Sequence, residues 1–220
     1  MMISPEMFYE EYLKGKNVEQ TLSVIRGLKN TIGRLKNSLE NPNSSRVFMA
    51  PTPETQISCN RDYLERAKMY LLELGSKYEP TPKELRSEEF NNHLCNVKRI
   101  TLEFHGYCGL PEEYQITIED NKVKFENKYA PIQIEDFEQN SEYLYSKEAL
   151  VEALENLHIG EWRKNYTSDR FGVFILDGTQ WSLEIEFNDG YETKRIYGSN
   201  AYPYNFNKLR DIFELDQFEE

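Results

Sequence analysis

Apolar residues recur with two different periods along this chain. Up to about residue 92 they recur every three or four residues, which is the spacing of an amphipathic helix. From Val97 onward they recur every second residue, as in strands with one buried face. The change of period predicts an α+β protein with an all-helical region at 1–92 and an acidic α+β domain at 93–220.

Two long apolar stripes dominate the helical region. The first, Val18–Leu39, and the second, Ile57–Leu74, are joined by a Pro-, Ser- and Asn-rich loop, so they predict a helical hairpin. Gly27 and Gly33 interrupt the first stripe. Because glycine weakens a helix by about 1 kcal/mol relative to alanine, their presence indicates close packing of a neighbouring helix at these positions.

Residues 93–220 predict an antiparallel sheet with helices on one face. The expected order of elements is β-β-β-α-β-β-β-α, with two β-meanders, because strands joined by short turns pair in antiparallel fashion. The helix between the meanders starts at Ser146, and acidic residues 127–145 before it read as irregular. Its apolar spacing predicts three inward side chains: Leu150, Leu154 and Leu157.

The second meander begins at Val173 and has the clearest strand of the chain, Gln180–Phe187. Asp177-Gly178 and Asp189-Gly190 flank this strand and can supply the positive φ of tight hairpin turns. Its apolar side chains share one face: Trp181, Leu183, Ile185 and Phe187. An aromatic loop and a short helix from Phe206 complete the chain.

Charge is concentrated in the C-terminal part. Residues 97–220 carry 13 Lys/Arg against 25 Asp/Glu and so hold the whole net charge of −12. Phosphate binding needs a basic surface, so this part is not expected to bind nucleic acid or an anionic membrane. A basic protein is the more suitable partner. The start of the chain lacks the pattern of a signal peptide, and no transmembrane helix is expected. We therefore expect a cytoplasmic protein.

No metal or cofactor is expected. The three cysteines, Cys59, Cys95 and Cys108, form no C-x-x-C pair. His93 with Cys95, and His105 with Cys108, have spacings that match no structural zinc pattern. His105 beside Cys108 also lacks the surroundings of a nucleophile–base pair, although it stays open as one.

An aromatic surface is the candidate binding site. The loop Gly198–Phe206 combines residues able to take left-handed backbone conformations with a stiff Tyr-Pro-Tyr segment, and rigid tyrosines lose little entropy on binding. The segment His158–Tyr166 adds aromatic and charged groups. The predicted binding residues are Trp162, Arg163, Tyr166, Asn200, Tyr202 and Tyr204. The alternative is structural: the tyrosines and Trp162 pack on the sheet, and Asn205 caps the last helix.

His158 and Glu161 offer a second interpretation, because a neighbouring imidazole and carboxylate can carry out general acid–base chemistry. No phosphate-binding, dinucleotide-binding, zinc-protease or serine-hydrolase motif accompanies them. A basic stripe at Arg26, Lys29 and Lys36 allows phosphate contact, but it reads better as a solvated face or as a surface that docks on an acidic domain.

Two segments carry a resemblance: TLSVIRGLKNTIGRLKN near the start, and DGTQWSLEIEF with YGSNAYPYNF near the end. Together they resemble a family of uncharacterised bacterial proteins over nearly the whole chain. The resemblance implies a bacterial cytosolic protein and brings no activity, cofactor or site residue with it.

These observations favour a non-enzymatic protein-binding module with an acidic, Tyr/Trp-rich surface, of inhibitor or immunity type in one version. Two alternatives stay open. One is a small enzyme that uses His158 with Glu161, or His105 with Cys108, in a cleft between the two regions. The other is a structural homodimer formed through the helical hairpin.

Overall fold

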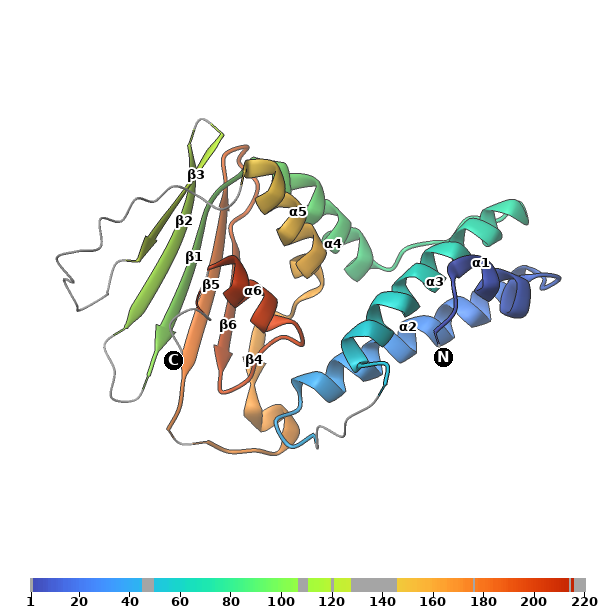
Figure 1. Ribbon diagram of the computed structural model, residues 1–220, viewed down its shortest axis with the longest axis horizontal. Coiled ribbons are helices and arrows are strands. Elements are labelled where there is room, and N and C mark those ends of the chain that lie inside the picture. The colour runs from blue at the N-terminus through green and yellow to red at the C-terminus, as the bar shows by residue number, and fades with distance from the viewer. Residues whose placement is uncertain are drawn as a thin grey trace. The chain divides into compact units, whose positions relative to one another are not determined.

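The computed structural model describes residues 2–44, 50–106, 111–119, 121–127, 146–175, 177–213 and 215 (Figure 1). The chain forms two compact units, residues 1–80 and 81–220. The boundary falls before helix α4 (Pro82–His93), which the apolar period alone places in the helical region 1–92. α4 belongs to the second unit because Phe90 is buried in the core of that unit. Residues 128–145 of the expected irregular stretch lie outside the described residues.

The first unit is the expected helical hairpin. Its elements are α1 (Pro5–Phe8), the π-helix η1 (Tyr9–Leu13), α2 (Val18–Glu40) and α3 (Pro53–Glu73). Asn17 caps α2 in a reciprocal pair with Gln20, which satisfies two amide donors at the helix start. α2 and α3 share one apolar core, with Ile25, Leu28, Ala67 and Leu71 in it. None of the helices in the described part of the chain is long and apolar enough to cross a membrane.

Gly27 and Gly33 do not mark a close helix contact. A Cβ added at either glycine would meet no atom of the described residues within 4 Å. The expectation of tight packing is wrong, since Gly27 lies on the exposed side of α2. A tyrosine makes a tight contact of this unit instead. The Tyr63 hydroxyl accepts a hydrogen bond from the Ile3 amide at 3.0 Å and donates one to the Ile3 carbonyl at 2.7 Å.

The second unit is built on a six-stranded sheet with strand order β3-β2-β1-β5-β6-β4. The strands are β1 (Val97–His105), β2 (Glu112–Glu119), β3 (Lys122–Asn127), β4 (Asn165–Thr167), β5 (Gln180–Phe187) and β6 (Lys194–Ser199). The helices are α4, α5 (Lys147–Leu157) and α6 (Phe206–Ile212), with 3₁₀ turns η2 (Leu94–Asn96), η3 (Ile159–Glu161) and η4 (Ser168–Phe171). Helices and a mostly antiparallel sheet confirm the α+β class.

One face of the sheet is covered by α4, α5 and α6 (Figure 1). The central strands β1 and β5 place Ile100 opposite Ile185 and Leu102 opposite Leu183, all at most 1% exposed. Alternation puts these side chains on the helix-covered face, as the period-2 pattern predicts. The three inward side chains predicted for α5 are also buried: Leu150, Leu154 and Leu157.

The last three strands do not form the expected second meander. β4 pairs in parallel with β6, so this half of the prediction is wrong. Val173–Ile175 is not a strand, because both edges of β5 are already paired, with β1 on one side and β6 on the other. Asp177-Gly178 therefore closes no hairpin. Of the two predicted turn glycines, only Gly190 has a positive φ, +84°.

Candidate functional site

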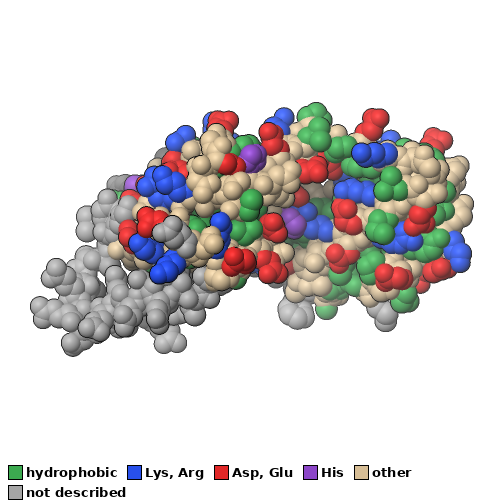
Figure 2. All heavy atoms as spheres, turned by 90° about the horizontal axis from the view of Figure 1, so that it is seen from above, with side chains coloured by type: hydrophobic (Ala, Val, Ile, Leu, Met, Phe, Trp, Pro, Cys, Tyr) green, Lys and Arg blue, Asp and Glu red, His purple; other side chains and the backbone are tan. Residues whose placement is uncertain are grey.

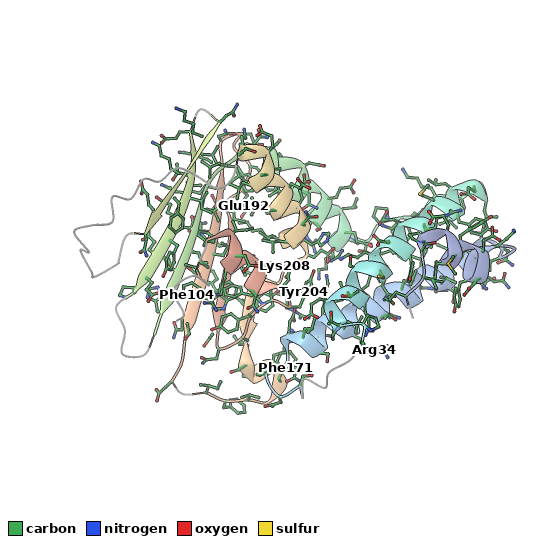
Figure 3. The ribbon with its side chains drawn as sticks, in the orientation of Figure 1. Arg34, Phe104, Phe171, Glu192, Tyr204 and Lys208 are labelled. Carbon is green, nitrogen blue, oxygen red and sulfur yellow. The ribbon has the colours of Figure 1, made fainter. Side chains whose placement is uncertain are left out.

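The predicted aromatic segments meet at one end of the sheet. The parallel register places Thr167 of β4 beside Ser199 of β6, and the antiparallel register places Gln180 of β5 beside the same Ser199. The end of β4, the start of β5 and the end of β6 therefore lie together, here called the Ser199 end. Figure 3 labels Phe171, the last residue of η4 after β4, and Tyr204, in the loop between β6 and α6.

Two of the six predicted binding residues are packed in the core. Trp162 is 6% exposed and Tyr166 is 4% exposed. The Tyr166 hydroxyl accepts a hydrogen bond from the Arg163 amide at 3.0 Å, and the Tyr166 ring lies 6.0 Å from that of Trp181. These contacts favour the structural interpretation for both aromatic residues. Arg163, between them, is exposed.

The loop after β6 is held by Asn200. Asn200 has a φ of +53°, a left-handed conformation that its short polar side chain tolerates. The backbone amide of Asn200 donates a hydrogen bond to the Thr179 carbonyl, with an N–O distance of 3.0 Å. Gly178 packs closely against Asn200: a Cβ there would lie 1.8 Å from the Asn200 side-chain oxygen, so the Asn200 side chain would have to move. The loop is thus fixed to the segment that leads into β5.

Tyr202 is packed and accessible at the same time. Its ring stacks on Trp181 with centroids 6.0 Å apart and lies 4.8 Å from Phe206. Burial raises the pKa of Tyr202, and a hydrogen bond with Thr179 opposes this shift. Tyr202, like Asn200 and Tyr204, nevertheless remains partly exposed, so three of the predicted residues can contact a partner from a rigid support.

Asn205 does not cap α6 with its side chain. It occupies the capping position, but its side-chain amide donates to the Leu157 carbonyl at the end of α5, at 2.8 Å. The predicted capping bond is wrong because this buried amide joins two helices instead. The last carbonyls of a helix have no hydrogen-bond partner within the helix. The Asn205 side chain supplies one for Leu157 and so links the end of α5 to the start of α6.

Exposed apolar side chains at the Ser199 end were missed by sequence reasoning. Phe174 is 83% exposed and Ile175 is 45% exposed, in the loop between η4 and β5. The apolar run at 173–176 resembles a buried strand. The contrary signal is its short length between Gly172 and Asp177-Gly178, since glycine on both sides is typical of a loop.

Charged side chains of both signs are interspersed on the protein surface. Across the face in Figure 2, Asp and Glu side chains alternate with Lys and Arg side chains. On the sheet face opposite the helices, Arg99 pairs with Glu186, and Arg195 pairs with Glu184 at 2.8 Å. These one-to-one pairs place opposite charges side by side across neighbouring strands and leave the acidic excess of this unit unchanged.

A cluster of titratable groups lies at the opposite end of the sheet. Asp189, in the β5–β6 turn, accepts hydrogen bonds from His93 Nδ1 at 2.6 Å, from the Asn96 side chain at 2.8 Å and from the Tyr191 amide at 3.0 Å. The His93 ring stacks on Tyr191 with centroids 3.9 Å apart. The hydrogen bond from His93, followed by that from the Tyr191 amide, lowers the pKa of Asp189. Burial raises the pKa of Tyr191.

This cluster could not be found from sequence. His93 ends α4 and Asp189 follows β5, 96 residues later, and only the pairing of β1 with β5 brings them together. The carboxylate fixes the orientation of the imidazole, as in His–Asp pairs that hold a ring in place for proton transfer or ligand binding. Asn96 and the Tyr191 amide fix the carboxylate in turn.

The two residue pairs predicted as possible catalytic groups are His158 with Glu161 and His105 with Cys108. His158 ends α5 with a left-handed φ of +51°, and its carbonyl accepts the Glu161 amide at 2.9 Å. His105 Nε2 lies 3.7 Å from the Glu103 carboxylate, while Cys108 lies outside the described residues. Within the described ranges no group of three or more His, Cys, Asp or Glu side chains is placed to hold a metal ion. Catalysis by His158 with Glu161 stays a prediction.

Comparison with known proteins identifies no relative: no family model matches the chain, and no curated protein or solved structure shows a significant match. The resemblance to uncharacterised bacterial proteins therefore stays a prediction.

The Asp189 contacts predict how stability depends on pH. Because the folded-state pKa of Asp189 lies below its ordinary value of 3.8, the contribution of the carboxylate to stability is fully present above that pH and is lost as pH falls through the folded-state pKa. We expect Asp189→Asn to lower the stability of the second unit at pH 7 and to have a smaller effect below pH 3.8. Urea unfolding followed by tryptophan fluorescence measures this, because both tryptophans, Trp162 and Trp181, lie in this unit.

Asp177→Asn is the matched control, since Asp177 is an exposed aspartate of the same unit. It is expected to leave the stability at pH 7 nearly unchanged, within about 0.5 kcal/mol. An Asp189→Asn variant whose stability difference from the parent protein were the same at both pH values would contradict the role given to the carboxylate.

Proposed function

We propose that this protein is a non-enzymatic protein-binding module of the bacterial cytoplasm whose contact surface is the Ser199 end of the sheet. The observation that carries the proposal is Phe174, which is 83% exposed beside Ile175. The β4–β6 and β5–β6 registers bring this loop to the same end as the Asn200–Tyr204 loop. An apolar patch beside partly exposed tyrosines is typical of a protein interface.

The energetics of this surface favour recognition. Burying a phenylalanine side chain that water now surrounds stabilises a complex by roughly 1.5–3 kcal/mol. Tyr202 and Asn200 are already ordered, by ring stacking on Trp181 and by the bond to Thr179. Binding therefore costs little conformational entropy on this side. The partner that fits is a protein with an apolar pocket for Phe174 and a polar rim for the tyrosines and Asn200.

The charge of the domain favours a basic partner. Residues 97–220 carry the whole net charge of −12, so a positively charged protein approaches them faster than a neutral one, and salt slows this approach. On the face shown in Figure 2, positive and negative side chains are interspersed. Charge is therefore expected to affect the rate of association more than the affinity of the complex. An inhibitor or immunity protein that blocks a basic target is one version of this function.

The test is capture of a partner with the whole chain as bait, followed by affinity measurement with the purified partner. Phe174→Ser is expected to weaken binding by about tenfold or more, as loss of a buried phenyl ring predicts. Tyr204→Ala, added to Phe174→Ser, is expected to weaken binding of the partner further. Raising the salt concentration should slow association.

Leu85→Ser is the matched control, because Leu85 is 51% exposed on α4 of the same unit. It removes an exposed apolar side chain away from the Ser199 end and is expected to leave affinity unchanged. Equal loss in the Leu85 and Phe174 variants, or no loss in either, would show that the Ser199 end is not the contact surface.

A further inference from the structure

The side of α2 that points away from the core of the first unit has an unusual composition for this acidic chain. Between Glu19 and Glu40 every charged residue of the helix is basic: Arg26, Lys29, Arg34 and Lys36. The helical period identifies the positions opposite the buried apolar stripe. These positions, here called the outward face, carry only small or polar side chains, and all but Gly33 are exposed: Ser23, Arg26, Gly27, Asn30, Gly33, Arg34 and Asn37.

The structure divides the basic residues of α2 into two groups. The Lys29 ammonium donates a hydrogen bond to the Tyr78 hydroxyl at 2.7 Å, and both Lys29 and Lys36 are only partly exposed. Arg26 and Arg34 are exposed on the outward face, and Figure 3 labels Arg34. The two arginines lie about 12 Å apart along the helix axis. The outward charge of α2 therefore comes from this pair rather than from the basic stripe that the sequence predicts.

Neither arginine has an acidic partner in the described part of the chain. Other basic side chains of the same unit do form ion pairs: Lys14 with Glu10, Arg66 with Glu73, and Lys68 with Glu65. A Cβ at Gly27 or Gly33 would meet no described atom within 4 Å, so packing against described residues does not account for either glycine. Glycine weakens a helix interior, but it lets another molecule approach the backbone closely. Unpaired positive charge beside small residues suits a partner that is anionic and approaches closely.

We propose that α2 binds double-stranded DNA with its outward face in the major groove. This groove is about 12 Å wide and admits an α-helix, and the stretch from Ser23 to Asn37 extends about 21 Å along the helix axis. Arginine contacts phosphates and guanine edges, serine contacts phosphates, and asparagine pairs with adenine edges. The acidic second unit is repelled by DNA, so we expect modest affinity, with a Kd of about 10⁻⁴–10⁻⁶ M as in sequence-independent binding. This site lies in the first unit and does not depend on the proposed binding surface.

The first test is fluorescence anisotropy of a labelled DNA duplex of mixed sequence, titrated with the whole chain at several salt concentrations. Each phosphate contact contributes about 0.9 to the steepness of log K against log salt. Arg26→Gln and Arg34→Gln are each expected to reduce this steepness by about that amount, and together to weaken binding by about tenfold. Lys14→Gln is the matched control, because it removes one positive charge from an exposed side chain of the same unit outside α2. It should leave affinity and salt dependence nearly unchanged.

Asn30→Asp separates DNA binding from folding. The new carboxylate would lie one turn from both Arg26 and Arg34, a spacing at which ion pairs support a helix. Urea unfolding of the first unit, followed by circular dichroism, should therefore keep its midpoint or shift to higher urea. The same carboxylate repels phosphate, so binding of the duplex should fall by about tenfold or more.

An RNA duplex of the same sequence should bind more weakly than the DNA duplex, because its deep, narrow major groove does not admit a helix. Absence of DNA binding by the parent protein, equal binding of the RNA duplex, or unchanged binding by Asn30→Asp would overturn the proposal. A parent protein that self-associates without binding DNA, and that loses this self-association in Asn30→Asp, would assign the outward face to the acidic unit of a second copy instead.

Discussion

Gly198→Ala is expected to destabilise the second unit by about 3 kcal/mol, the upper part of the range for overpacked cores. A Cβ at this position of β6 would lie 1.9 Å from Nε1 and 2.1 Å from Cε2 of Trp181. The indole cannot easily move, because it is 2% exposed and its N–H donates to the Ala201 carbonyl at 2.9 Å. The Phe206 ring also packs against the indole, with the ring centroids 4.6 Å apart. Any displacement of the ring therefore breaks contacts with both loop and helix.

Urea unfolding followed by tryptophan fluorescence measures this loss, since both tryptophans report the second unit alone. Gly27→Ala in α2 is the matched control, because a Cβ there meets nothing within 4 Å in the described residues. In a helix interior that change should stabilise the first unit by about 0.5–1 kcal/mol, seen by circular dichroism.

A second variant tests the cause of the Gly198→Ala effect. If overlap with the indole is responsible, Gly198→Ala should cost much less in a Trp181→Leu background, because the leucine side chain is too short to place atoms where Nε1 and Cε2 of the indole lie. Trp162 remains as the fluorescent reporter. Equal losses in both backgrounds would mean that β6 requires glycine for another reason, such as its backbone conformation.

Gly198 illustrates what local sequence patterns can and cannot predict. As a loop residue it suggests left-handed backbone, but here it lies inside a strand and is needed for close approach of a side chain from the neighbouring strand. Asn200, two residues later, does have the left-handed conformation that its type favours. A turn preference is a property of one residue, whereas close approach depends on which strand pairs beside it.

Strand pairing also limits what could be predicted of the site. Alternation in Gln180–Phe187 was sufficient to identify a half-buried strand, and Trp181, Leu183 and Ile185 are indeed buried. It could not indicate that β5 pairs with β1 and β6 on its two sides, which leaves Val173–Ile175 outside the sheet. The exposed loop of the proposed binding surface and the His93–Asp189 pair both follow from that pairing.

The two predicted recognition segments are rich in aromatic residues, but composition cannot separate packed rings from exposed ones. Trp162 and Tyr166 are buried, with three exposed residues between them, whereas Tyr204 and Asn200 stay partly exposed. An aromatic ring serves equally well in a core and in an interface. The parallel pairing of β4 with β6 turns Tyr166 toward the core, whereas Trp162 lies before this strand, directly after η3.

Leu154→Ala is expected to destabilise the second unit by about 3 kcal/mol, within the range for truncation of a buried leucine. Leu154 is 0% exposed, in the middle of α5, between two other inward leucines that are also buried. Alanine is the best helix former, so the helix itself gains slightly, and the loss comes from the cavity and the missing contacts with the sheet. Glu155→Ala, at the next and exposed position, should stay within about 0.5 kcal/mol.

The same variant tests whether the two units unfold independently. If they do, Leu154→Ala shifts the fluorescence transition in urea, while the part of the circular dichroism change that comes from α2 and α3 keeps its midpoint. A parallel shift of both signals would mean that the helical hairpin and the sheet unfold as one cooperative system, even though each has its own apolar core.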